Sequence, residues 1–228
     1  MSADRSAGGT GTALEAAAIP RQRWGRERTQ RLSDDERLLY QWILGSFAAG
    51  RIPGAGALAA AAARFGLDAE QALATLARED LAHRDPATGA ILVAYPFSAR
   101  PRGHRVRIDG MHWVEAMCAI DALGIAAMLE RSIEILSRDP LSGGEVWVRI
   151  DPGDGAWWEP EHAVVLAGSA CTSGPSYRGC CDVLNFFESS EYALQYLLAH
   201  PQISGHAITI PEAIEAGRTI FGDLLKED

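Results

Sequence analysis

The chain of 228 residues is long enough to bury a sizeable core in one or two domains, and 47% hydrophobic with 22% charged residues excludes a disordered or fibrous protein. The formal net charge of −9 disfavours partners that are held through phosphates, nucleic acids above all. No apolar run approaches the ~18–20 residues that cross a membrane, and the start lacks the basic-then-apolar order of a secretion signal, so we expect a cytoplasmic protein without membrane contact.

The first predicted segment, residues 1–32, is a flexible N-terminal arm, because it has almost nothing to bury. It is rich in arginine and could touch an acidic surface, although a solvated tail is the favoured interpretation. These arginines are Arg21, Arg23, Arg26, Arg28 and Arg31.

Residues 33–100 are predicted to form a small winged-helix-like domain of three helices and a hairpin. Ser33 and Glu36 form a capping box before the first helix, and two more helices are expected over about 55–65 and 69–80. A turn at 86–89 then joins two extended pieces. The two helices that could serve for recognition carry one basic residue each, Arg64 and Arg78, so a structural or substrate-covering role is favoured over DNA binding.

Residues 101–103 are predicted to be a linker to a larger domain over 104–228, in which strand and helix patterns alternate. Strands are expected at 104–109, 145–150, 162–167, 180–187 and 206–210, and a long helix at 113–130. Ser190 is expected to cap a further helix that Pro201 ends, and Pro211 to open the last one. The fold class is therefore α+β, with a winged-helix-like domain before a mixed catalytic domain of mainly antiparallel strands.

Two carboxylates, Glu115 and Asp121, break the apolar pattern of the predicted helix at 113–130. Cys118 and Asp121 are three residues apart and share a helix face. Burial would raise the pKa of the aspartate, so that it could hold and deliver a proton near neutral pH. The alternative is a core cysteine beside an aspartate that pairs with an arginine, for which the candidates are Arg105, Arg107 and Arg149.

The remaining cysteines suggest a soft-metal site rather than disulfides or zinc. The chain has no CxxC motif, its six histidines lack zinc-ligand spacing, and cytosolic thiols stay reduced. In a strand, only one thiol of the Cys180–Cys181 pair would reach a given site. Two thiolates from different elements suit a thiophilic metal, although a buried structural pair is the open alternative. Cys171, in a Gly/Ser-rich loop, is interpreted as incidental or as a metal shuttle.

Two segments, MCAIDALGI at 117–125 and GCCDVLNFFES at 179–189, resemble the signatures of alkylmercury lyases, the organomercurial lyase family of bacterial mercury resistance. The resemblance covers about 33–225 and implies detoxification by protonolytic cleavage of R–Hg–X to R–H and Hg(II). It makes Cys118 and Cys180 the catalytic, mercury-binding thiols, Asp121 the proton donor and a further candidate ligand, and Cys181 a structural neighbour. It implies organomercurials as substrates, no cofactor, cytosolic thiols for turnover, and mercuric reductase as a downstream partner.

The sequence departs from this family pattern at a few positions. Glu115 and Met117 stand where aromatic residues are common, Asp182 replaces a frequent histidine, and a cysteine expected within 131–141 is missing. These departures concern substrate fit, and other soft organometals such as organotin stay open as substrates. The alternative function is a cysteine-based soft-metal-binding or metal-responsive regulatory protein without turnover. A cysteine hydrolase is disfavoured, because His112 lies six residues before Cys118.

Overall fold

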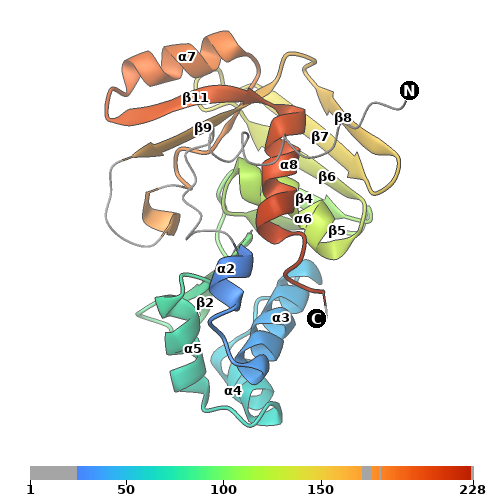
Figure 1. Cartoon of the computed structure of the whole chain (residues 1–228). Helices are drawn as coiled ribbons and strands as arrows, with labels where there is room; N and C mark the ends of the chain where they lie inside the picture. Colours follow the sequence, from blue (N-terminus) through green and yellow to red (C-terminus); the bar gives the residue numbers. More distant parts are fainter. Residues whose placement is uncertain (1–24, 171–175, 180, 227–228) are drawn as a thin grey trace, which may run out of the picture.

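The computed structural model of the chain describes residues 25–170, 176–179 and 181–226, and it shows the expected α+β fold (Figure 1). Four helices gather at one end of the molecule, and two antiparallel sheets with three further helices form the rest. One large apolar core runs through both parts, because its buried residues come from the N-terminal helices as well as from the sheets.

The N-terminal helices follow the predicted order. They are α2 (Gly25–Thr29), α3 (Asp34–Ala48), α4 (Ala55–Arg64) and α5 (Ala69–Arg78). The capping box of α3 is confirmed: the Glu36 amide donates to Ser33 Oγ at 3.2 Å, and the Ser33 amide donates to Glu36 Oε2 at 2.9 Å. Asp68 caps α5 by accepting from the Gln71 amide at 2.8 Å. Local side-chain chemistry therefore sets where these helices begin.

The larger sheet has eight antiparallel strands in the order β1-β2-β3-β5-β4-β6-β7-β8. Strands from both sides of residues 101–103 belong to it, so the division into domains at that point stays a prediction. The strands are β1 (Ala82–Arg84), β2 (Ile91–Ala94), β3 (Phe97–Ser98), β4 (His104–Ile108), β5 (His112–Ala116), β6 (Ile133–Arg138), β7 (Glu145–Asp151) and β8 (Gly155–Glu159).

The smaller sheet has the order β10-β9-β11 and carries helix α7 on one face. Its strands are β9 (Val164–Ala170), β10 (Phe186–Phe187) and β11 (Ile203–Thr209), while α7 spans Ser190–Ala199. A short 3-10 turn, η2 (Ser176–Arg178), lies in the connection between β9 and β10. This connection carries the second cysteine segment to the interior.

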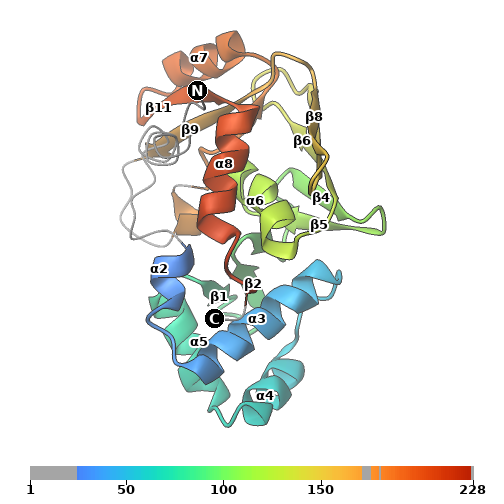
Figure 2. The same cartoon turned by 45° about the vertical axis from the view of Figure 1, so that its right-hand side comes forward.

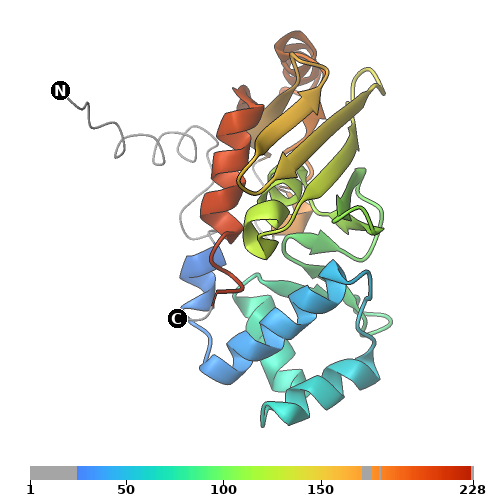
Figure 3. The ribbon, with the colours of Figure 1, turned by 90° about the vertical axis from the view of Figure 1, so that its right-hand side faces the viewer.

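Helices α6 (Ala119–Leu129) and α8 (Ile210–Phe221) lie side by side, with α6 nearer the larger sheet and α8 on the outside of the molecule (Figures 2 and 3). Helix α6 packs on the larger sheet and α8 on the smaller one, and the two helices pack closely on each other. Gly124 and Gly217 stand at their contact, where a Cβ atom on Gly217 would lie 2.7 Å from the Gly124 nitrogen. Glycine at these positions lets the two helix backbones approach.

The predicted helix at 113–130 is wrong in its first third. Residues 112–116 form strand β5, whose Val114 pairs with Val106 of β4 and whose Glu115 pairs with Arg105. The helix begins only at Ala119, after Cys118. A short apolar run is compatible with strand and helix alike, and the pairing with β4 and β3 decides the outcome.

Of the predicted strand at 180–187, the described residues 181–185 are not a strand, and only the last two residues are. Residues 181–183 form a turn, and only Phe186–Phe187 pair with β9. Helix α7 is capped by Ser189 rather than Ser190, because the Ser189 hydroxyl accepts from the Tyr192 amide at 3.3 Å. Strands β6 and β8 were not predicted.

The glycine contact between α6 and α8 predicts a large effect of one added methyl group. Gly217→Ala should lower the free energy of unfolding by about 1–3 kcal/mol, because its Cβ meets backbone atoms rather than side chains that can move. Gly45→Ala, in α3 with no atom within 4 Å of the added Cβ, should instead raise it by roughly 0.5–1 kcal/mol. Urea unfolding of both variants measures this, and equal effects would contradict the close-contact account.

Candidate active site

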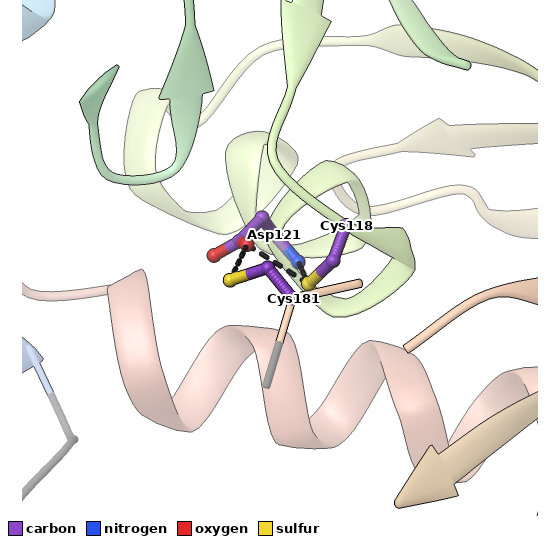
Figure 4. A group of neighbouring side chains, drawn as sticks. All are labelled: Cys118, Asp121 and Cys181. Carbon is purple, nitrogen blue, oxygen red and sulfur yellow. Dashed lines mark hydrogen bonds between the residues drawn. The ribbon is translucent and has the colours of Figure 1, made fainter. Parts of the chain in front are cut away.

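Two thiols and one carboxylate converge inside the molecule. The Cys118 thiol donates to Asp121 Oδ2 at 2.8 Å, and the Cys181 thiol lies 3.7 Å from the same oxygen. The three ligand atoms all lie within 4.8 Å of one another, and all three side chains are buried (Figure 4). Two soft sulfur donors and one oxygen at this spacing form a donor set that suits a thiophilic metal.

Cys118 owes its position to the junction between strand β5 and helix α6. Its backbone is extended, with φ −157°, and it is the N-cap of α6. The Asp121 amide donates to Cys118 Sγ at 3.4 Å, so the thiol takes the place of the usual serine or aspartate cap. Asp121 then falls in the first helical turn, where the positive end of the helix dipole favours negative charge.

Asp121 is a carboxyl group that titrates near neutrality. Burial raises its pKa to about 7, although hydrogen bonds from both thiols and the charges of Arg28 and Arg102 act in the opposite direction. The carboxyl group can therefore both accept and deliver a proton at physiological pH.

The arginines that the sequence offered as structural partners for Asp121 are engaged elsewhere. Arg107 pairs with Glu134, Arg149 donates to Asp151 at 2.7 Å, and Arg105 lies over the Trp113 ring at 4.7 Å. The alternative of an aspartate neutralised by one of these arginines is therefore wrong.

Both described thiols are held in their protonated form. Burial raises the pKa of Cys118 well above its usual range, and the contacts with Cys181 and Asp121 raise it further. A hydrogen bond with Cys118 lowers the pKa of Cys181, but burial and the charge of Asp121 outweigh it, so the net shift is upward. The thiols therefore need a base when they bind a metal, and Asp121 is the base in contact with both.

The three groups open into a small, mostly apolar cavity of about 50 Å³. Such a volume accommodates about three water molecules, or a small organic group carried by a metal. Its walls come from α2, α3, the residue before β1, the turn between β2 and β3, α6, the Cys181 segment, and α8 with the residues after it. They are Arg28, Tyr40, Leu81, Tyr95, Ile120, Ser176, Leu184, Ile220, Phe221 and Leu224.

A polar network centred on Asp80 closes this cavity on one side. Asp80 accepts from the Ser176 hydroxyl at 2.6 Å, and its Oδ2 lies 3.3 Å from Arg28. His83 Nε2 lies 2.6 Å from its other oxygen. Burial alone would raise the pKa of Asp80, but the hydrogen bonds of His83 and Ser176 and the charge of Arg28 together lower it. The network ties α2 and the segment before Cys181 to the end of α5.

Arg102 connects three of the positions at which the sequence departs from the family pattern. Its backbone amide donates to Glu115 Oε2 at 2.9 Å, its Nε lies 3.5 Å from the Met117 carbonyl oxygen, and its guanidinium pairs with Asp182. Arg102 also lines a second space, a polar cleft of about 260 Å³ that Cys181 lines as well. Cys181 thus borders both an apolar cavity and a polar cleft.

The second thiol of the sequence prediction, Cys180, lies outside the described residues, and so does Cys171. Cys181 was predicted to be a structural neighbour, whereas its thiol lies in the site. The argument from strand alternation does not apply here, because Cys181 is in a turn. Neither Tyr95, which lines the cavity, nor Asp80 of the adjoining network was predicted from the sequence. A tyrosine next to a proline and an aspartate with a positive φ of 55° carry no motif that would reveal them.

A buried dithiol and a carboxyl group on an α+β scaffold define a class of proteins that bind a soft metal, and comparisons with known proteins narrow this class. The family model for alkylmercury lyase matches residues 97–222. Alkylmercury lyases of Staphylococcus epidermidis and Bacillus cereus are both 29% identical, over 127 and 118 residues. These matches cover 56% and 52% of this chain, and the chain spans only 57% and 53% of those relatives' lengths.

The chain belongs to the alkylmercury lyase family. A solved structure, the mercury-bound form of MerB2, has the same fold with a TM-score of 0.73 and 20% sequence identity. That match covers 90% of this chain and 98% of the other. The resemblance noted in the two cysteine segments is thereby confirmed at the level of the family and the fold.

The raised pKa of Asp121 predicts how stability depends on pH. Between the unfolded value of 3.8 and about 7, the folded state keeps a proton that the unfolded state has lost, so stability falls as pH rises. The free energy of unfolding of the wild type, relative to Asp121→Asn, should therefore drop by roughly 3 kcal/mol from pH 4 to pH 7. Chemical denaturation across this range measures it. A constant difference would show that Asp121 titrates normally.

Proposed function

We propose that the chain is an organomercurial lyase, which cleaves the carbon–mercury bond of R–Hg–X by protonolysis. The observation that carries this proposal is the convergence of two protonated thiols on one carboxyl group whose pKa is about 7. Simple metal capture needs the thiols but has no use for a buried proton donor. Family membership supports the same reaction class.

In the first stage, mercury exchanges its ligand X for sulfur. A thiol of the site loses its proton and binds mercury, and the proton leaves with X as HX. The second thiol then transfers its proton to the Asp121 carboxylate, which lies 2.8 Å from the Cys118 sulfur, and also binds mercury. The carboxyl group acts here as a general base, for which a pKa near 7 is suited.

In the second stage, Asp121 returns the proton to carbon. Two thiolates donate electron density to mercury and weaken its bond to carbon, and the protonated carboxyl group delivers its proton to the departing carbon. R–H leaves, and Hg(II) stays on the two sulfurs with its charge unchanged. The two thiol protons are thus accounted for, one in HX and one in R–H. The apolar walls of the cavity suit the organic group R.

The second mercury ligand comes from the Cys180–Cys181 pair. The family resemblance favours Cys180, whereas the geometry of the described residues favours Cys181, which is 6% exposed and within reach of both Cys118 and Asp121. We propose that Cys118 is the first mercury ligand and that Asp121 is the proton donor. The second ligand is either Cys181, which the geometry supports, or Cys180, which the family resemblance supports, and experiment must decide between them.

Release of Hg(II) completes the proposed cycle. Cytosolic thiols would exchange with the bound sulfurs, and mercuric reductase would take the metal onward. The polar cleft beside Cys181, lined by Arg102 and Asp182, provides a route for such polar thiols that is separate from the apolar cavity. We propose that the enzyme acts in the cytoplasm, where such thiols are kept reduced, as part of mercury resistance. Among the described residues, no helix is both long and apolar enough to cross a bilayer.

The alternative function, a regulatory protein that binds DNA, finds little support in the charges around the N-terminal helices. Arg78 at the end of α5 lies 3.3 Å from Glu79, and Arg84 pairs with Glu70 through two contacts of 2.7 Å. Paired guanidinium groups on an acidic protein leave little positive charge for phosphates. The assay below separates the enzyme from a metal-binding protein without turnover.

The proposal predicts hydrocarbon release. The wild type, incubated with phenylmercury or methylmercury and excess thiol, should release benzene or methane, measured by gas chromatography. Cys118→Ser should abolish release, because mercury loses a soft ligand. Asp121→Asn should slow release by at least about 100-fold, the usual contribution of a general acid, while Hg(II) binding persists.

Three further serine variants identify the second thiol and provide the control. Loss of release in Cys181→Ser but not in Cys180→Ser would assign the ligand to Cys181, and the reverse result would assign it to Cys180. Cys171→Ser is the matched control and should keep the wild-type rate. Tight Hg(II) binding by the wild type without any hydrocarbon would refute the lyase and favour a metal-binding protein.

A further inference from the structure

Ser176 is anchored to the N-terminal helical part of the chain by one carboxylate. Its hydroxyl donates to Asp80 Oδ2 at 2.6 Å, and its amide donates to the same oxygen at 3.2 Å. Asp80 comes directly after the end of α5 and lies 96 positions before Ser176 in the chain. Ser176 is buried, so one distant side chain satisfies both of its hydrogen-bond donors inside the protein.

The carbonyl group of Ser176 in turn holds the residues that follow it. It accepts from the Gly179 amide at 3.3 Å and from the Cys181 amide at 3.1 Å. The Cys181 backbone is therefore bonded directly to the residue that Asp80 anchors. Cys180 is the residue before Cys181, so this link serves the cysteine pair whichever of its two thiols binds mercury.

The cysteine pair has a second anchor on its other side, at helix α6. The Leu184 carbonyl oxygen accepts from the Ala119 amide at 2.9 Å, directly after Cys118. The described residues 181–183 form a turn, so no ladder of strand hydrogen bonds fixes this part of the segment. The placement of the pair consequently depends on its two ends, one held at Cys118 and the other by Asp80.

The Asp80 carboxylate is itself fixed and charged. The Arg28 guanidinium donates to the Asp80 carbonyl oxygen at 2.7 Å and lies 3.3 Å from Oδ2, and His83 Nε2 lies 2.6 Å from Oδ1. Burial raises the pKa of Asp80, but the hydrogen bonds of His83 and Ser176 and the Arg28 charge lower it overall. A charged acceptor forms stronger hydrogen bonds than a neutral one. Asp80 does not line the cavity, so it acts on the site from outside.

A metal held by two thiols requires both sulfurs at one point. Cys118 is fixed at the start of α6, whereas the second thiol comes from the turn described above. Once the first sulfur has bound, binding of the second is intramolecular, and its effective concentration depends on how closely the chain confines that thiol. An anchor on the turn therefore raises the affinity for the metal without contacting it.

We propose that Asp80 is a positioning residue, whose carboxylate acts through Ser176 to hold the cysteine pair where one of its thiols can share a metal with Cys118. The inference rests on the proposed function for the identity of the metal. The positioning itself requires only a thiophilic metal bound by two thiols. The N-terminal helical part thereby contributes to mercury capture through a residue that does not touch the substrate.

The backbone of Asp80 allows its side chain to be removed without strain. Its φ of 55° lies in the left-handed region, which glycine adopts freely and asparagine tolerates. Glutathione should extract Hg(II) about tenfold more readily from Asp80→Gly than from the wild type, the effect of losing one hydrogen bond to a charged group. Asp80→Asn keeps an oxygen that accepts from Ser176, so it should recover most of the wild-type retention.

Asp139→Gly is the matched control, because it removes a buried carboxylate that also joins two segments but does not line the cavity. Asp139 accepts from the Leu141 amide at 2.7 Å and from the Glu188 amide at 2.9 Å. This variant should lower the melting temperature and leave the glutathione competition close to that of the wild type. A general loss of stability is thereby distinguished from a loss of positioning.

Ser176→Ala tests whether Asp80 acts through Ser176. By itself it should weaken Hg(II) retention in the same direction as Asp80→Gly, because the hydrogen bond of 2.6 Å is lost. Combined with Asp80→Gly it should add nothing further, since the two changes remove one shared interaction. If Asp80→Gly does not fold, Ser176→Ala carries the test, and wild-type retention by it would overturn the inference.

Three other outcomes would also overturn it: wild-type retention by Asp80→Gly, an equal loss of retention in Asp139→Gly, or additive effects in the double variant. Glutathione competition for Hg(II) needs no turnover. A wild type that holds Hg(II) but releases no hydrocarbon would therefore refute the lyase, and the retention of Hg(II) by these variants would still decide the role of Asp80.

Discussion

The hydrogen bond from the Cys118 thiol to Asp121 is the interaction on which the rest of the structure depends. A carboxyl group and a thiol in a dry interior are costly unless each satisfies the other. Cys118 caps helix α6 and Asp121 lies in its first turn. Because this helix is buried on nearly every side, the larger sheet, α8 and the Cys181 segment enclose both groups. The same burial that makes the pair costly brings the pKa of Asp121 to about 7, where it can transfer protons.

The surroundings of the pair divide the space beside it by polarity. The apolar cavity touches Cys118, Asp121 and Cys181, while the polar cleft touches Cys181 but neither Cys118 nor Asp121. Arg102 lines the cleft and contacts Glu115 and Asp182, two of the positions that differ from the family pattern. Changes at separate points of the sequence thus meet at one arginine, and they alter the cleft rather than the three chemical groups.

The N-terminal helices contribute to the site instead of standing apart from it. Tyr40 of α3 and Arg28 of α2 line the cavity, and Arg28 contacts the Asp80 network that fastens the segment before Cys181. This agrees with the substrate-covering role favoured over DNA binding from the sequence. It also explains why one continuous core runs from the helices into the sheets.

The sequence by itself determined the features that depend on neighbouring residues. The capping box at Ser33, the helix it begins, the Cys-x-x-Asp pair and the family signatures are all local patterns. Only the tertiary structure decided that residues 112–116 form a strand, since the pairing with β4 overrides an ambiguous apolar run. It also decided that residues 181–183 turn, that the Cys181 thiol meets Asp121, and that Tyr95 lines the cavity. These last features join residues tens of positions apart, and no local pattern encodes contacts at that separation.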